Sequence, residues 1–134
     1  MLDRRSFTRT LALGLAGTAV QGVASPQAQT KKKLLPGHTG ITWGFSPADA
    51  ERAIADTASL GFQGYESFGN VLEAWESKGG LDTLLTAARL PLRSAYCPVN
   101  LSDAPRRPTE IEKLVRWARL IKKCGGSVAV IGPN

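Results

Sequence analysis

Apolar and polar positions after residue 40 alternate between two kinds of segment. A short apolar or aromatic run is followed by a stretch with helical apolar spacing, and that stretch ends at glycine. The strand-like runs are residues 41–45, 62–68, 92–97 and 127–131. The last run, Val-Ala-Val-Ile, lacks polar alternation, which predicts a parallel strand covered on both faces. The pattern predicts an α/β fold with four strands and three helices.

The first helix has clear start and stop signals. Ser46 and Asp49 form a capping pattern around a first-turn proline, Pro47, and Gly61 is placed to end the helix in a left-handed turn. The predicted apolar stripe consists of Ala50, Ala53, Ile54, Thr57 and Ala58.

The two later helices are predicted from similar signals. Asn70 and Glu73 repeat the capping pattern for the second helix, which we expect to break at Gly79-Gly80 and to resume at Leu81. An irregular loop, residues 98–108, precedes the third helix, which Thr109 and Glu112 are expected to cap. The predicted apolar face of that helix consists of Ile111, Leu114, Val115, Ala118 and Ile121.

Successive βα units form a parallel sheet that either closes into a barrel or stays open and doubly wound. An open nucleotide-binding sheet favours a G-x-G-x-x-G turn after its first strand. Residues 44–47 read Gly-Phe-Ser-Pro instead. The sequence therefore disfavours a nucleotide site, although the pattern alone leaves barrel and open sheet undecided.

The positive charge is concentrated at the N-terminus. Residues 1–33 contain three arginines and three lysines against the single acid Asp3, so they account for +5 of the net charge of +6. The remaining chain is nearly neutral and lacks the basic field that phosphate backbones require. We therefore expect no nucleic-acid partner.

The N-terminal segment is similar to a twin-arginine export signal. Residues 3–9 contain Arg4-Arg5 with Phe7 and Arg9 following, and residues 11–24 form a moderately apolar stretch too short for a stable membrane span. We predict a signal peptide over residues 1–24, a tether over 25–39, a folded part over 40–134 and a periplasmic location. A chance arginine pair before an amphipathic anchor helix is the alternative.

The two cysteines and the single histidine give no metal-type spacing. Cys97 is predicted at the end of a strand and Cys124 at the end of the next helix, which are opposite ends of a βα layer. We therefore expect two free thiols, because a disulfide needs Cα atoms within about 7 Å. His38 precedes the predicted first strand and is expected to lie away from any chemistry.

Four segments together resemble the xylose-isomerase-like barrel family, which includes sugar-phosphate isomerases and epimerases, inosose-handling enzymes and endonuclease IV. They are residues 40–45, Gly-Phe-Gln-Gly-Tyr-Glu at 61–66, the strand through Leu92-Arg93-Ser94, and Gly125-Gly126 before a Val-rich strand. The resemblance implies a (β/α)8 TIM barrel of about 250 residues. The chain is thus expected to be an incomplete barrel, the N-terminal half only. Pairing with a second copy or another partner is the alternative.

In this family the resemblance implies a divalent metal held by residues of later strands, beyond Asn134, so we assign no metal ligand here. Residues at strand ends are candidates to bind a sugar or polyol. The candidates are Trp43, Phe45, Glu66, Tyr96, Asn100 and Asn134. The aromatic side chains either pack on a sugar ring or fill the barrel, and Glu66 either binds substrate or pairs with Arg93.

Two functions remain open on these grounds. The first is an exported sugar isomerase or epimerase, truncated and inactive as it stands, whose complete form moves a proton beside a carbonyl with a metal. The second is a periplasmic carbohydrate-binding or interaction protein without catalysis. Absence of early histidines argues against the nuclease branch. We also expect the isolated chain to have poor solubility.

Overall fold

The computed structural model describes residues 33–133, and the predicted signal peptide, most of the tether and Asn134 lie outside them. These residues form one parallel sheet in the order β1-β2-β3-β4. The strands are β1 (His38–Thr39), β2 (Tyr65–Phe68), β3 (Leu92–Pro98) and β4 (Val128–Gly132). The α-helices are α2 (Ala50–Ser59), α3 (Gly69–Glu76), α4 (Leu81–Ala87) and α5 (Arg107–Lys123).

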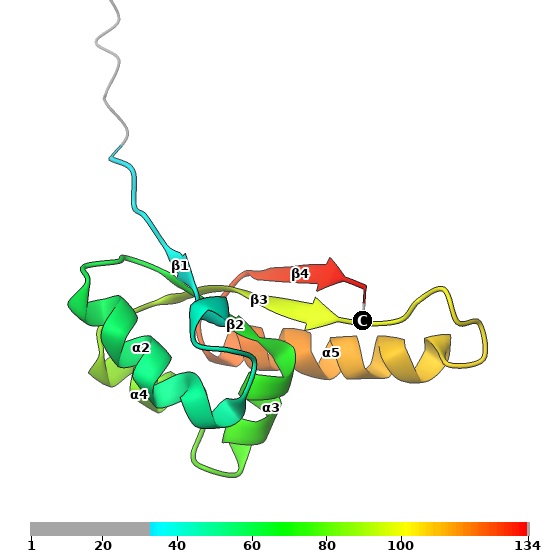
Figure 1. Ribbon diagram of the computed structural model, residues 1–134. Helices are drawn as coiled ribbons and strands as arrows, with labels where there is room; N and C mark the ends of the chain where they lie inside the picture. Colours follow the sequence, from blue (N-terminus) through cyan, green and yellow to red (C-terminus); the bar gives the residue numbers. More distant parts are fainter. Residues whose placement is uncertain (1–32, 134) are drawn as a thin grey trace, which may run out of the picture. The chain divides into compact units, whose positions relative to one another are not determined.

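The helices lie on one face of this sheet, as Figure 1 shows, with α3 on β2 and β3 and α5 on β3 and β4. A doubly wound sheet reverses its strand order and carries helices on both faces. Here each strand adds beside the previous one, which is the arrangement of a barrel wall. The prediction of an α/β fold with a partial (β/α)8 barrel is confirmed.

The predicted first strand, residues 41–45, is wrong. The strand β1 ends at Thr39, and Gly40–Thr42 form a short 3-10 helix, η1. Gly40 lies against the Tyr65 and Phe68 rings, where a Cβ atom would collide with the Tyr65 hydroxyl. The chain turns there and leaves Ile41 about half exposed, at 52%. The apolar run at residues 41–45 therefore does not form a strand.

The start of the first helix follows the prediction closely. Ser46 caps a short 3-10 helix, η2 (Pro47–Asp49), by accepting a hydrogen bond from the Ala48 N–H at 3.2 Å. That turn leads directly into α2. Gly61, with φ at +81°, ends the helix region as expected. The predicted break of the second helix is also confirmed, since Gly79 and Gly80 separate α3 from α4.

The predicted caps of the two later helices are wrong. Neither α3 nor α5 has a side-chain cap, and α5 begins at Arg107, before Thr109 and Glu112. Asn70 instead donates to the Phe45 carbonyl at 3.0 Å, and Glu73 accepts from the Trp117 indole at 2.8 Å. Tertiary contacts have therefore taken the polar groups that the local pattern assigned to the helix ends.

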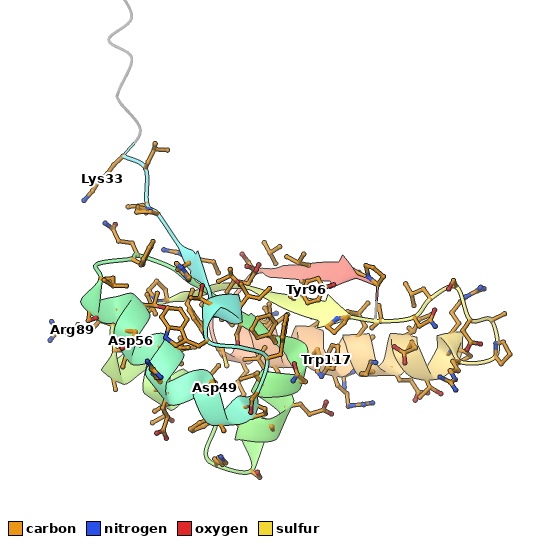
Figure 2. The ribbon with its side chains drawn as sticks, in the orientation of Figure 1. Lys33, Asp49, Asp56, Arg89, Tyr96 and Trp117 are labelled. Atoms are coloured by element: carbon orange, nitrogen blue, oxygen red, sulfur yellow. The ribbon has the colours of Figure 1, made fainter. Side chains whose placement is uncertain are left out.

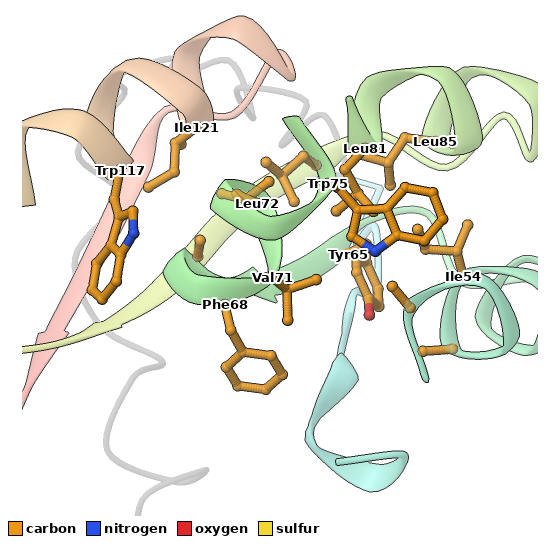
Figure 3. Close-up of a cluster of buried hydrophobic side chains, with 14 of the residues drawn as sticks. Ile54, Tyr65, Phe68, Val71, Leu72, Trp75, Leu81, Leu85, Trp117 and Ile121 are labelled. Atoms are coloured by element: carbon orange, nitrogen blue, oxygen red, sulfur yellow. The ribbon is translucent and has the colours of Figure 1, made fainter. Parts of the chain in front are cut away.

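Most of the core lies between the sheet and the helices (Figure 3), whereas Phe68 is buried on the other face of the sheet, against Phe45. The members of the core come from every α-helix and from β2 and β3, and those labelled in Figure 3 are Ile54, Tyr65, Phe68, Val71, Leu72, Trp75, Leu81, Leu85, Trp117 and Ile121. On α5 the buried residues are Trp117 and Ile121, whereas Ile111, Val115 and Ala118 are exposed. The predicted apolar face of this helix was thus rotated from the buried one.

The last strand pairs in parallel register with β3, as predicted, but it is not covered on both faces. Val128, Val130 and Ile131 are 51%, 37% and 54% exposed. β4 is the edge of the sheet, and among the described helices only α5 packs beside it to any extent. The expectation of full coverage is therefore wrong for this segment.

Candidate functional site

A cavity of about 480 Å³ lies at the carboxyl ends of β2, β3 and β4. Half of its lining residues are aromatic, and its one charged side chain is Lys113. The lining residues are Phe45, Phe68, Asn70, Tyr96, Pro98, Lys113, Trp117 and Pro133. The carboxyl ends of barrel strands are where (β/α)8 enzymes place their active sites.

The first aromatic wall is formed by Phe45 and Phe68. Their ring centres are 4.6 Å apart with an interplanar angle of 56°. Phe68 is buried at the end of β2, while Phe45 is 52% exposed on the turn before η2. The Asn70 amide holds that turn by donating to the Phe45 carbonyl. Phe45 therefore presents its ring at the cavity on a fixed backbone.

Tyr96 forms the opposite wall, on the face of the sheet that the helices leave free (Figure 2). It pairs with Phe68 on one side and Val130 on the other, so all three side chains point to the same face. Its hydroxyl donates to the Pro133 carbonyl at 3.2 Å, and its ring lies against Gly132. The ring is thereby held at the end of β4.

The helix α5 supplies the third wall through Trp117 and Lys113. The Trp117 indole N–H donates to Glu73 at 2.8 Å, which fixes the ring between α3 and α5. The Lys113 ammonium lies 5.1 Å from the centre of that ring. Sequence reasoning missed both residues because it considered only strand ends, whereas Lys113, Trp117 and Ile121 share one side of a helix at spacings of four residues.

The predicted site residues do not all meet at this cavity. Phe45 and Tyr96 line it, although Phe45 does so from the turn before η2 and not from a strand end. Trp43 does not, because its indole N–H donates to Asp56 of α2 at 2.9 Å and its ring packs 5.3 Å from that of His38. Trp43 therefore stabilises the fold near β1. Asn134 lies outside the described residues.

Asn100 does not line the cavity either. Its side-chain oxygen accepts hydrogen bonds from the Ser102 hydroxyl at 2.8 Å and from the Asp103 N–H at 3.3 Å. Its own backbone N–H donates to Glu110 at 3.2 Å. Asn100 therefore shapes the loop between β3 and α5 and offers its carboxamide oxygen to that loop.

Glu66 is not among the residues that line the aromatic cavity. It is the second residue of β2, two residues before the end of the strand, and it is in register with Thr39 and Ser94. It accepts a hydrogen bond from the Ser94 hydroxyl at 2.6 Å. The suggested pair with Arg93 is wrong, because Arg93 donates to the Gln63 carbonyl instead, at 3.3 Å.

A smaller cavity of about 250 Å³ is associated with Glu66. His38, which we expected to precede the first strand, belongs to β1 and lines this cavity with Thr39, Arg93 and Ser94. The His38 ring also packs edge-on against Phe62, with centres 4.9 Å apart. Of the predicted substrate residues, Phe45 and Tyr96 thus line one cavity and Glu66 lines another, whereas Trp43 and Asn100 line neither.

The two cysteines are free, as expected. Cys97 is buried on the helix-covered face of β3, where burial first and the charge of Glu66 second raise its pKa to about 11. Burial also raises the pKa of Cys124, at the end of α5. Neither thiol is activated as a nucleophile, since the thiolate form is disfavoured.

Residues 33–133 do not assemble a metal site. Within this part of the chain, no three His, Cys, Asp or Glu side chains gather as ligands. The sequence suggested Glu66 as a carboxylate near a strand end, and this carboxylate accepts a hydrogen bond from the Ser94 hydroxyl. These residues alone therefore do not fit the divalent metal implied by the family resemblance.

None of the helices described has the length and apolar character needed to cross a membrane.

Comparison with known proteins gives one structural likeness. No protein-family model and no curated protein matches the sequence. A crystal structure of a His-tagged D-allulose 3-epimerase from Methylomonas sp., in complex with D-allulose, matches with a TM-score of 0.56 at 23% sequence identity. The match covers 74% of this chain and 36% of the epimerase, so the chain spans about a third of that length. The likeness shows that the fold corresponds to part of a TIM barrel.

Proposed function

We propose that this chain forms part of the sugar-binding wall of a (β/α)8 barrel of the isomerase and epimerase type. The observation that carries the proposal is the aromatic cavity at the carboxyl ends of the strands, lined by Phe45, Tyr96 and Trp117. Aromatic rings offer apolar faces to the C–H surface of a sugar. The fold neighbour was crystallised with D-allulose, a sugar, which supports the same ligand class here.

Catalysis in this proposal requires more of the barrel than residues 33–133 contain. An epimerase must remove and return a proton at carbon, which needs a positioned general base. The aromatic cavity has no carboxylate or histidine among its described lining residues. A metal-assisted reaction would also need ligands beyond those described. The chain alone is therefore expected to bind sugar weakly and to leave it unreacted.

Titration of the full-length chain with D-allulose, followed by amide NMR, tests this proposal. Residues around Phe45 and Tyr96 should shift together, and Tyr96→Ala should weaken binding roughly tenfold, through loss of one ring wall. Leu60→Ala is the matched control, because Leu60 is exposed at the end of α2, outside the cavity lining. The absence of shifts at the cavity would overturn the proposal.

A carbohydrate-binding protein without catalysis is the second candidate. The described cavity lining supplies ring surfaces and a hydrogen-bond donor, which suffice to bind a sugar without catalysis. Incubation with D-allulose in deuterated water distinguishes the two, because epimerisation exchanges the carbon-bound proton with solvent. A form of the protein that includes the complete barrel should exchange that proton if it is an epimerase, whereas a pure binding protein should bind the sugar without exchange.

The proposal includes export through the twin-arginine pathway, which the Arg4-Arg5 pair and the apolar stretch over residues 11–24 support. Replacing both arginines with lysine should retain the full-length chain in the cytoplasm of a bacterial host. Fractionation followed by immunoblotting measures this. Unchanged delivery to the periplasm would contradict this route.

A further inference from the structure

The most shielded ion pair among residues 33–133 lies beside the aromatic cavity. Lys113 and Glu110 are 2.7 Å apart, and their side chains are 22% and 16% exposed. In every other ion pair of this part of the chain both side chains are about a third exposed or more. Exposed pairs contribute little, because water and salt screen them. Because the Lys113–Glu110 pair is partly shielded from water, its charges act more strongly on groups nearby.

The two members of the pair have different positions. Lys113 lines the cavity and lies over the ring of Trp117. Glu110 is not among the cavity-lining residues, and it also accepts the Asn100 N–H from the loop after β3. Glu110 is therefore held by two contacts, one with Lys113 and one with the loop after β3. The hydrogen bond from Lys113 is the main reason that the pKa of Glu110 is lowered, so the carboxylate is ionised at neutral pH.

The chemistry of an ammonium group leaves Lys113 free to bind a ligand. It has three N–H donors. One is directed to Glu110, and the ammonium group also makes a cation–π interaction with the ring of Trp117. A remaining donor is available to a hydroxyl oxygen in the cavity. Because Glu110 is 2.7 Å away, a ligand in the cavity meets a nearly cancelled charge.

We propose that Lys113 is an additional ligand-binding residue of this cavity and that Glu110 makes the cavity selective for an uncharged sugar or polyol over a phosphorylated one. This inference rests on the proposed sugar-binding function and specifies its substrate class. A phosphate group would have to compete with Glu110 for Lys113 and would be repelled by the carboxylate. A neutral hydroxyl accepts a hydrogen bond from Lys113 while the ion pair stays intact.

Calorimetric titration of the full-length chain with D-allulose and with D-allulose 6-phosphate tests the inference. The wild type should prefer the uncharged sugar. Lys113→Met should weaken D-allulose binding roughly tenfold, the usual effect of losing a hydrogen bond to a charged group. Glu110→Gln should strengthen binding of the phosphate roughly tenfold, since the ammonium charge is no longer cancelled. Glu110→Asp should retain the wild-type preference.

Lys78→Met is the matched control, because Lys78 also lies over a tryptophan ring, 4.8 Å from the centre of Trp75, but does not line the cavity. It should leave both affinities unchanged. A gain in phosphate affinity in Glu110→Gln cannot come from misfolding. If Lys113→Met binds D-allulose normally while Tyr96→Ala does not, this inference fails and the proposed function stands. If the wild type binds neither sugar, both are overturned.

Discussion

Trp117 is the side chain through which α3, α5 and the aromatic cavity meet. Its ring packs directly on Gly69, the first residue of α3, and its N–H is held by Glu73 one turn later. A Cβ atom at position 69 would overlap the fused carbons of the indole. Close packing therefore requires glycine at position 69. Backbone conformation does not, because the φ of Gly69 lies outside the left-handed region.

Gly69→Ala should destabilise the protein by about 1–3 kcal/mol, the usual cost of adding a methyl group to a packed contact. Urea unfolding measures the change in the free energy of unfolding. In a Trp117→Leu background, where the ring is absent, the same substitution should have a clearly smaller effect. Equal effects in the two backgrounds would show that the ring is not the cause.

The buried thiol of Cys97 makes stability depend on alkaline pH. Its pKa is about 11 in the folded protein, against a usual value of 9.0, so the folded state holds its proton where the unfolded state has lost it. This contribution is complete below pH 9 and is lost as pH rises towards 11, by at most about 1.4 kcal/mol for each pH unit.

The Cys97→Ala variant removes that titration and tests the dependence. Burial raises the pKa of Tyr65 to about 12, and this contributes in the same direction at higher pH in both proteins. Urea unfolding between pH 8.5 and 10 should therefore show a steeper loss of stability in the wild type than in Cys97→Ala. Parallel curves would contradict the assignment to Cys97.

At the level of helices and strands, the features set by neighbouring residues were predictable and those set by distant contacts were not. β3, the split of α3 from α4, and the glycine stop at Gly61 followed from local pattern, because each depends on neighbouring residues. The turn at Gly40 depends on Tyr65 and Phe68, which are distant in the sequence. No local signal could have revealed it.

The candidate site was predictable to the same degree. The strand-end rule identified Tyr96, which lies near the end of β3, and it named Phe45 from a strand that does not form, because Phe45 lies on the turn before η2. It also named Glu66, which lies two residues before the end of β2 and does not line the aromatic cavity. Lys113 and Trp117 were missed because only strand ends were considered, and because packing against α3 buries a face of α5 that differs from the predicted one.

The turn between α3 and α4 gives a graded test of backbone strain. Gly79 and Gly80 have φ values of +95° and +92°, and a Cβ at Gly79 would meet open space, whereas one at Gly80 would collide with Asp82. Gly79→Ala should cost about 1–2 kcal/mol for the left-handed conformation alone. Gly80→Ala should cost more, because a φ of +92° with a ψ of 149° lies in a region almost confined to glycine. Thermal or urea unfolding ranks the two, and a smaller effect at Gly80 would refute the described turn.

For the molecule as a whole, the exposed edge at β4 is the main liability. Val128, Val130 and Ile131 leave apolar side chains and unpaired backbone groups accessible. Sheet edges of this kind promote association unless they are covered or charged. The chain as it stands is therefore expected to associate with itself at moderate concentrations.

Ile131→Lys should reduce that association, because a charged side chain at an edge strand opposes pairing. Light scattering against protein concentration measures the effect. Leu60→Lys is the control, since Leu60 is 69% exposed on the turn after α2, away from the edge strand. If Leu60→Lys reduces scattering as much as Ile131→Lys does, general charge and not the edge is responsible.

The central claim is that the sheet is a barrel wall, with parallel strands in sequential order. Nuclear Overhauser contacts in the isotope-labelled full-length chain test it most directly. Contacts should connect Ser67 with Ala95 and Ala95 with Ala129, in parallel register, and α3 should contact α5 on the same side of the sheet. Antiparallel contacts between β3 and β4, or helices on opposite faces, would contradict the account.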